Sequence, residues 1–283
     1  MAELLRGLPV AAALTAELTA RCGALREKGV IPTLAVVRVG ENPSDISYEE
    51  AVVKRCGKAG IEVNGFPLPG DCEQARLLDV IRSINGDQAI HGCILFRPLL
   101  DRGMEAAACA ALDPAKDVDG MTAASLAGVF AGTGEGFPPC TAQACLEILD
   151  HYGVKLSGKH AVVVGRSLVI GRPAAMLLQG RDATVTMCHS KTKDLPAACR
   201  SADILVAAAG SVGLIGAACA APGQTVLDVG TNVGVDGGLL GDVDFDAVEP
   251  VVGAITPVPG GVGAVTTAVL CKHVIEAAER AAG

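Results

Sequence analysis

A glycine-rich turn after an apolar run has the composition of a dinucleotide-binding loop. The run HAVVVG (160–165) leads into Arg166 and Ser167, and a second glycine follows at Gly171. Glycines let the backbone turn sharply and approach a pyrophosphate, whose charge the N-terminus of the next helix stabilises. Because this spacing differs from G-x-G-x-x-G, the loop taken alone fits an ordinary strand–turn–helix connection equally well.

The end of the next apolar run bears on the choice between NADP and NAD. NAD enzymes commonly place a carboxylate there, which accepts a hydrogen bond from the ribose 2′-hydroxyl. Here the chain reads CHSKT (188–192), without a carboxylate. Ser190 can donate a hydrogen bond to a 2′-phosphate, and Arg166 or Lys191 can supply positive charge. The pattern favours NADP, with NAD kept as an alternative; the structural alternative is that Lys191 is an ordinary solvated loop charge.

Apolar runs that resemble buried strands alternate with helical segments in both halves of the chain. The predicted strands cover 33–40, 61–68, 91–98, 160–165, 183–188, 203–210 and 225–230. The predicted helices cover 48–60, 73–85, 142–152 and 264–281. This alternation predicts an α/β fold with parallel sheets. Residues 113–141 read as a loop, and loops held by a scaffold often carry function.

Composition and charge exclude several classes of protein. Half of the 283 residues are apolar, which excludes intrinsic disorder. Lys and Arg number 23 against 31 Asp and Glu, a net charge of −8, so we expect no nucleic-acid partner. The length predicts about two domains, with a boundary near 140–150.

We also expect no membrane span, no metal site and a cytoplasmic location. Residues 204–227 carry no charge, but several glycines and Pro222 interrupt them, which favours a strand, a turn and a short helix in a soluble core. The apolar N-terminus lacks the basic region of a signal peptide and reads as an amphipathic helix. The 11 cysteines are odd in number and form no C-x-x-C pair, which is typical of reduced thiols.

Several segments, taken in order, resemble the methylenetetrahydrofolate dehydrogenase/cyclohydrolase family. The matching segments are VGENPSDISY (39–48), DPAKDVDG (113–120), PPCT (138–141), GKHAVVVGRSLVIGRP (158–173), ATVTMCHSKT (183–192), DVGTN (228–232), GDVDF (241–245) and ITPVPGGVG (255–263). Any one of them could arise by chance, whereas the ordered set is highly specific.

The resemblance implies an N-terminal α/β folate domain (1–141) and a Rossmann-like NADP-binding domain (142–264), with the active-site cleft between them. A C-terminal helix, about 265–283, would return to the first domain. The family oxidises 5,10-methylenetetrahydrofolate to the methenyl form and passes the hydride to NADP⁺. Many members then add water to give 10-formyltetrahydrofolate. The resemblance also implies a homodimer.

The family's site residues transfer to matching positions of this chain. Tyr48 matches a tyrosine that lines the folate pocket, and Asp119 matches the aspartate that anchors the pterin. A carboxylate suits that role because it can accept two N–H donors from an aminopyrimidine edge. The matches to cofactor contacts are Gly165, Arg166, Ser167, Ser190 and Thr231. The matches in the substrate loop are Pro259, Gly260 and Gly261, although this loop also reads as a simple turn.

Two departures concern the water-addition step. The family's bifunctional members carry Tyr-x-x-x-Lys, with the lysine central to that step, but the residue four after Tyr48 is Val52. Lys54 lies six residues after Tyr48. On a helix, position i+6 lies about 240° around the axis from Tyr48, whereas position i+4, where the family has its lysine, lies about 40° around. The family's V-Q-L-P-L-P reads LFRPLL (95–100) here, with Phe96 at the glutamine position. Both members of a polar pair are thus apolar.

These departures predict a dehydrogenase whose cyclohydrolase activity is lost or weak. General acid–base catalysis typically contributes about 10²–10⁴-fold to a rate, whereas hydride transfer depends mainly on positioning two ligands. The first alternative is a fully bifunctional enzyme that uses another group, such as Lys54 after distortion of its helix. The second alternative is a non-catalytic protein that binds folate and nucleotide.

Overall fold

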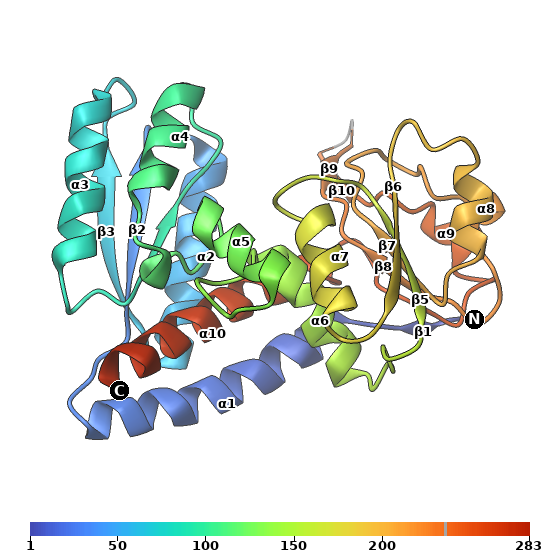
Figure 1. The fold of residues 1–283 in the computed structure, drawn as a ribbon, viewed down its shortest axis with the longest axis horizontal. Coiled ribbons are helices and arrows are strands. Elements are labelled where there is room, and N and C mark those ends of the chain that lie inside the picture. The colour runs from blue at the N-terminus through green and yellow to red at the C-terminus, as the bar shows by residue number, and fades with distance from the viewer. Residues whose placement is uncertain (235–236) are drawn as a thin grey trace. The chain divides into compact units, whose positions relative to one another are not determined.

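The computed structural model describes residues 1–234 and 237–283, which form two compact units (Figure 1). The six-stranded unit comprises Met1–Ala12 and Thr141–Thr266, and the three-stranded unit comprises Ala13–Cys140 and Thr267–Gly283. The expected domain 1–141 differs from these units at its start. Residues 1–12 belong to the six-stranded unit because strand β1 (Glu3–Leu4) pairs in parallel with β11 (Ala254–Ile255).

A parallel sheet with strand order β3-β2-β4 forms the core of the three-stranded unit. Its strands are β2 (Thr33–Val39), β3 (Glu62–Leu68) and β4 (Gly92–Leu95), at the three positions predicted from the apolar runs. Helices α2 (Pro43–Ala59), α3 (Gln74–Gly86) and α4 (Arg102–Ala111) connect or follow these strands. Val37, Leu77, Ile81 and Leu95 are among the side chains that fill the core next to the sheet.

Two helices of this unit differ from the prediction. Helix α2 begins at Pro43 rather than Tyr48, because Asn42 caps it by accepting a hydrogen bond from the Ser44 N–H. The segment 113–141, predicted as a loop, contains the short 3₁₀ helix η1 (Pro114–Lys116) and helix α5 (Ala123–Ala131). The capping hydroxyl of Thr122 and the left-handed Gly132 delimit α5, and these local signals outweigh the loop-like composition around them.

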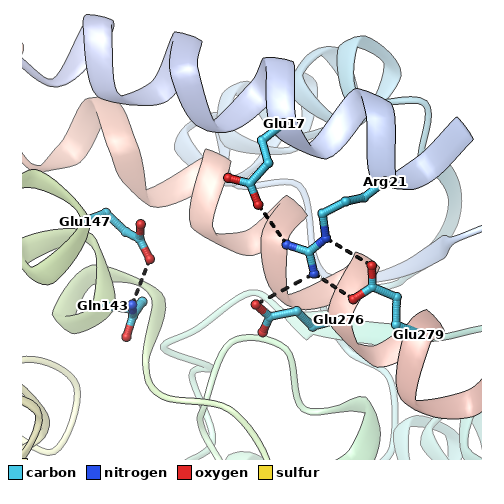
Figure 2. A network of polar contacts seen from close by, with 6 residues as sticks. All are labelled: Glu17, Arg21, Gln143, Glu147, Glu276 and Glu279. Carbon is cyan, nitrogen blue, oxygen red and sulfur yellow. Dashed lines mark hydrogen bonds and ion pairs between the residues drawn. The ribbon is translucent and has the colours of Figure 1, made fainter. Parts of the chain in front are cut away.

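Two long helices at opposite ends of the chain run side by side (Figure 1). They are α1 (Gly7–Glu27) and α10 (Gly263–Ala282). Figure 2 shows Arg21 of α1 between carboxylates, with its Nη2 2.6 Å from Glu279 and 4.0 Å from Glu276. Hydrogen bonding to Glu279 raises the pKa of Arg21. The ion pairs of Arg21 therefore connect helix α1 to helix α10.

Parallel strands also build the six-stranded unit, in the order β1-β11-β8-β7-β5-β6. The strands β5 (His160–Val164), β6 (Thr184–Cys188), β7 (Ile204–Ala207) and β8 (Thr225–Asp228) form at the predicted positions. The helices are α6 (Cys140–His151), α7 (Gly171–Gln179), α8 (Leu195–Arg200) and α9 (Phe245–Val248). A small antiparallel pair, β9 (Asn232–Val233) with β10 (Leu239–Leu240), lies outside the main sheet.

The uncharged segment 204–227 folds as expected into strand β7, a turn and a short helix, here the 3₁₀ helix η2 (Ala217–Cys219). Leu205 and Ala207 are buried in the core. Across residues 1–234 and 237–283, no helix combines the length and the apolar character that crossing a membrane requires. All 11 cysteines are free thiols.

Candidate functional site

The predicted site residues fall into two sets, one in each unit. Tyr48 and Asp119 belong to the three-stranded unit. The six-stranded unit holds the predicted cofactor contacts and the loop of Pro259, Gly260 and Gly261.

A buried carboxylate fixes the loop that carries Asp119. Asp117 is fully buried and accepts hydrogen bonds from the backbone N–H groups of Met121 and Thr122, at 2.9 and 2.7 Å. It also accepts one from the hydroxyl of Ser125, at 2.7 Å. These bonds tie the loop to the first turn of α5, so the backbone around Asp119 is held on its C-terminal side.

A histidine from α10 holds the same loop from another direction. The His273 ring is 2% exposed, and burial lowers its pKa to about 4, so the ring is neutral at pH 7. Its Nδ1 lies 2.8 Å from the carbonyl oxygen of Val118, to which a neutral ring donates an N–H. Gly120, next to Asp119, has a φ of +68°, and a Cβ there would lie 2.4 Å from the nitrogen of Pro139. Only glycine fits this turn without a shift.

The carboxylate of Asp119 has a polar environment of its own. Nη2 of Arg97 lies 3.9 Å from Asp119 Oδ2. The thiol of Cys140, which donates a hydrogen bond to the carbonyl oxygen of Val118 at 3.3 Å, also affects the Asp119 pKa. Burial raises the Asp119 pKa to about 6, and the charge of Arg97 opposes that rise. Asp119 is therefore mostly ionised at pH 7 and can accept N–H donors.

Tyr48 contacts Phe96, and the two ring centroids are 5.5 Å apart. The tyrosine is 37% exposed. Desolvation raises the pKa of its hydroxyl, and the negative charge of Asp119 raises it further. Tyr48 thus stays protonated at neutral pH, as a hydrogen-bond donor on the same side of the unit as Asp119.

The residues expected to bear on water addition lie in α2 and directly after β4. Val52 is 1% exposed and Phe96 is 6% exposed, so both are core side chains. Lys54 is exposed, and α2 is continuous from Pro43 to Ala59. The helix distortion that would turn Lys54 toward the face of Tyr48 is therefore not found in this helix. The match of Val52 to the family lysine stays a prediction.

In the six-stranded unit, a cavity of about 490 Å³ lies at the carboxyl ends of β5, β6 and β7. Four of the five predicted cofactor contacts line it, namely Gly165, Arg166, Ser167 and Ser190. The other lining residues are Val164, His189, Thr192, Leu195, Ala208, Ala209, Ser211 and Leu214. The fifth predicted contact, Thr231, is exposed and is not among them. Ligands of open α/β sheets bind at such strand ends.

Local geometry explains the residue types in the turn after β5. Gly165 has a φ of +132°, and a Cβ there would lie 2.0 Å from the carbonyl oxygen of Ala208, so a side chain is excluded. The hydroxyl of Ser167 accepts a hydrogen bond from the N–H of Ile170 at 3.1 Å. It therefore helps to start α7, whose N-terminus follows the turn. The resulting backbone can approach a phosphate closely.

A pair of buried aspartates, whose roles the sequence analysis did not assign, fixes a backbone segment that contributes Ala209 and Ser211 to the lining of the cavity. Asp242 accepts hydrogen bonds from the N–H groups of Ala209, Gly210 and Ser211 at 2.6, 2.8 and 2.8 Å. Asp228 in turn accepts one from the Asp242 N–H at 2.9 Å. Asp242 lies in the motif GDVDF and Asp228 in the motif DVGTN, so the sequence motifs already pointed to these two positions. Their partners, however, lie up to 33 residues away in the chain.

The loop Pro259–Gly261 packs against the start of α1. The N–H of Gly7 donates to the carbonyl oxygen of Gly260 at 2.8 Å, and a Cβ on Gly7 would lie 2.1 Å from the Gly261 oxygen. Gly261 is buried, whereas Pro259 and Gly260 are exposed. The exposed pair is available to a ligand, and its role in substrate binding stays a prediction.

Two family models match successive parts of the chain. Residues 5–119 match the catalytic domain of the tetrahydrofolate dehydrogenase/cyclohydrolase family. Residues 139–282 match the NAD(P)-binding domain of the same family. The cavity described above therefore lies in the part of the chain that matches an NAD(P)-binding domain.

Individual relatives span the whole chain. The "Bifunctional protein FolD" of Carboxydothermus hydrogenoformans is 49% identical over 281 residues, which are 99% of this chain and 98% of that protein. The crystal structure of the FolD dehydrogenase/cyclohydrolase from Campylobacter jejuni is 36% identical, with a TM-score of 0.95 and 99% of each chain covered. The Trypanosoma brucei enzyme, solved with NADP cofactor and inhibitor, is 34% identical with a TM-score of 0.91 over 99% of this chain and 98% of its own. This chain belongs to the tetrahydrofolate dehydrogenase/cyclohydrolase family.

Proposed function

We propose that this protein oxidises 5,10-methylenetetrahydrofolate with NADP⁺, as an enzyme of one-carbon metabolism. The cavity lined by Gly165, Arg166, Ser167 and Ser190 carries the proposal. Among the residues that line it, all within the described part of the chain, none is a carboxylate that would repel a 2′-phosphate. The Trypanosoma brucei relative, solved with NADP, supports this choice of cofactor.

The residues present fit a dinucleotide. A volume of about 490 Å³ lies in the range of ligand pockets, and Gly165 and Ser167 line it shortly before the N-terminus of α7, where a pyrophosphate would be stabilised. Ser190 would donate a hydrogen bond to the 2′-phosphate, and Arg166 would supply the opposite charge. When bound, NADP⁺ supplies the hydride acceptor. Thr231, which lies outside the cavity lining, is the weakest of the proposed contacts.

Folate recognition would rest on the three-stranded unit and on the loop Pro259–Gly261. The ionised Asp119 would accept N–H donors from the aminopyrimidine edge of the pterin, and Tyr48 would line the ring. Because the loop of Asp119 is held by Asp117 and His273, the carboxylate is positioned before the ligand arrives. Such positioning is the main requirement of hydride transfer between two bound ligands.

For the second step, the relatives favour a different conclusion from the sequence analysis. The Carboxydothermus hydrogenoformans and Campylobacter jejuni proteins are both named as bifunctional, and both align over nearly the whole chain. We therefore place the full dehydrogenase/cyclohydrolase, which yields 10-formyltetrahydrofolate, ahead of a dehydrogenase that has lost hydrolysis. One feature supports the narrower function: Val52 and Phe96, which the family resemblance matches to a lysine and a glutamine, are buried apolar side chains.

Product analysis distinguishes these functions. Purified protein is mixed with 5,10-methylenetetrahydrofolate and NADP⁺, and NADPH, methenyl and 10-formyl forms are followed together beside a sample without enzyme. Rapid formation of all three supports the bifunctional enzyme. NADPH with methenyl decay at the uncatalysed rate supports the dehydrogenase alone. Binding of both ligands without NADPH would refute the proposal and indicate a non-catalytic binding protein.

Two further features are proposals of the same kind. The family resemblance implies a homodimer, which light scattering on the purified protein tests directly. It also implies that residues 142–264 act as the cofactor domain and that 265–283 work with the folate domain. NADP⁺ binding that responds to changes in the first set and not in the second would support that assignment.

A further inference from the structure

We propose that Arg97 is a positioning residue for the folate, and that it acts through the carboxylate of Asp119. This inference rests on the proposed function, since it names what tunes the pterin anchor. Arg97 follows β4 directly, and 22% of its side chain is exposed against 25% for Asp119. Both side chains are thus partly exposed at the edge of the core, where a ligand can reach them.

Arg97 and Asp119 form an ion pair without a hydrogen bond. Arg97 Nη2 lies 3.9 Å from Asp119 Oδ2, which is within ion-pair range but beyond hydrogen-bond length. A carboxylate offers about four acceptor positions. Arg97 therefore supplies charge without occupying an acceptor, which leaves positions for N–H donors of a ligand. A close bidentate pair would have filled them.

The other titratable groups near Asp119 do not replace Arg97. From its own loop, the Asp117 carboxylate raises the Asp119 pKa. The Cys140 thiol of α6 and the Tyr48 hydroxyl of α2 are neutral, since the pKa of each is raised. His273 of α10 is neutral because burial lowers its pKa to about 4.

A lysine close by in the sequence is engaged elsewhere. The Lys116 ammonium donates hydrogen bonds to the carbonyl oxygens of Ile84 and Asp87, at 2.7 and 2.6 Å. Among the described residues, Arg97 is thus the cation that favours the ionised form of Asp119. Burial and the charge of Asp117 both raise the Asp119 pKa, so the charge of Arg97 determines down to which pH the Asp119 carboxylate stays ionised.

The test replaces Arg97 by leucine, which stands at this position in the family pattern V-Q-L-P-L-P. An opposite charge within about 4–6 Å lowers a carboxyl pKa by about 1–3 units, so its removal raises the Asp119 pKa from about 6 to at least about 7. At pH 7 the ionised fraction falls from about nine-tenths to half or less. We expect kcat/KM for 5,10-methylenetetrahydrofolate to fall roughly 2–90-fold at pH 7, the range that a rise of about 1–3 units in the Asp119 pKa gives, and to recover as the pH rises.

Two variants serve as controls. Arg97→Lys keeps the charge and should restore the acidic limb of the profile toward its original pH. Arg82→Leu removes an exposed arginine that pairs with Asp79 on α3, and should leave the profile unchanged. NADP⁺ affinity, measured by calorimetry, should be the same in all variants, since the cofactor cavity is in the other unit.

The outcomes separate this inference from the proposed function. If Arg97→Leu lowers kcat/KM equally at every pH, or if Arg97→Lys gives no rescue, Arg97 does not act through the charge of Asp119. If the unmodified protein forms no NADPH, the proposed function fails. The inference is then decided by the pH dependence of 5-formyltetrahydrofolate binding in the same variants, where an unchanged dependence or a lack of binding would overturn it.

Discussion

Asp242 accepts hydrogen bonds from three backbone N–H groups, Ala209 to Ser211, beside the cofactor cavity, and we call this arrangement the Asp242 clamp. Substitution by asparagine, whose side chain has the same shape, tests it. In Asp242→Asn, the amide oxygen can still accept from Ala209 and Gly210, which now share one Asp242 oxygen. The amide nitrogen would then face the N–H of Ser211 and the side-chain nitrogen of Asn232, two donors that the other oxygen accepts from at 2.8 and 3.0 Å. The hydrogen bonds from Ser211 and Asn232 are therefore lost, and the new amide N–H₂ donor faces these two donors without an acceptor between them.

The magnitude follows from those two bonds. A hydrogen bond to a charged group contributes about 1.5–3 kcal/mol, and neighbouring bonds are not additive, so we expect a loss of about 3 kcal/mol. For a unit of this size, that loss lowers the melting temperature by roughly 6–12 °C. Ala209 and Ser211 line the cavity, and if about half of the cost appears on binding, NADP⁺ affinity falls about tenfold.

Calorimetric titration with NADP⁺ and a thermal melt measure the two effects. Asp246→Asn is the matched control, because Asp246 is exposed on α9, four residues further along the chain. Affinity and melting temperature both equal to those of the unmodified protein would refute the clamp. A lower melting temperature with unchanged affinity would show that Asp242 stabilises the unit without shaping the cavity.

Three further predictions concern the loop of Asp119. Asp119→Asn should lower kcat/KM for the folate by roughly 10–150-fold, the value of one charge-assisted hydrogen bond, with unchanged NADP⁺ affinity by calorimetry. The His273 pKa is lowered from 6.5 to about 4, so the folded state favours the neutral ring and its stability contribution is lost as the pH falls from about 6.5 to about 4. Thermal melts over that range should therefore show a smaller loss of stability in His273→Asn than in the unmodified protein. Gly120→Ala places a Cβ 2.4 Å from the Pro139 nitrogen at a φ of +68°, so denaturant unfolding should show a loss of at least about 1–3 kcal/mol; a stability unchanged within error would contradict this account of the turn.

The sequence predicted the sheets because buried parallel strands are continuous apolar runs with a local signature. Strands such as β2 and β5 needed no distant information. Strand β1 has two residues and no pattern of its own, and it exists only through its pairing with β11. Helix α5 was missed because glycines and prolines surround a short segment whose Thr122 cap is the decisive signal.

The same contrast holds for the candidate site. Glycine-rich turns and ordered motifs pointed to Gly165, Ser190 and Asp119, since their chemistry is visible in their neighbours along the chain. The clamp of Asp242 and the pairing of Arg97 with Asp119 join segments separated by more than 20 residues. Such pairings depend on the order of the strands in each sheet, which cannot be derived from residue types and their spacing alone.

The pairing of β1 with β11 and of α1 with α10 has a consequence for the order in which the protein matures during synthesis. The partners of Glu3 and Arg21 are Ala254 and Glu279. These contacts of the first segments can therefore form only after nearly the whole chain has been synthesised. Neither unit is complete until the ribosome has nearly finished the chain, and contacts over such separations are slow to form. The later turns of α1 can contact the Lys58–Gly60 segment early, but the ion pairs of Arg21 with Glu276 and Glu279 form only after almost the whole chain has been made.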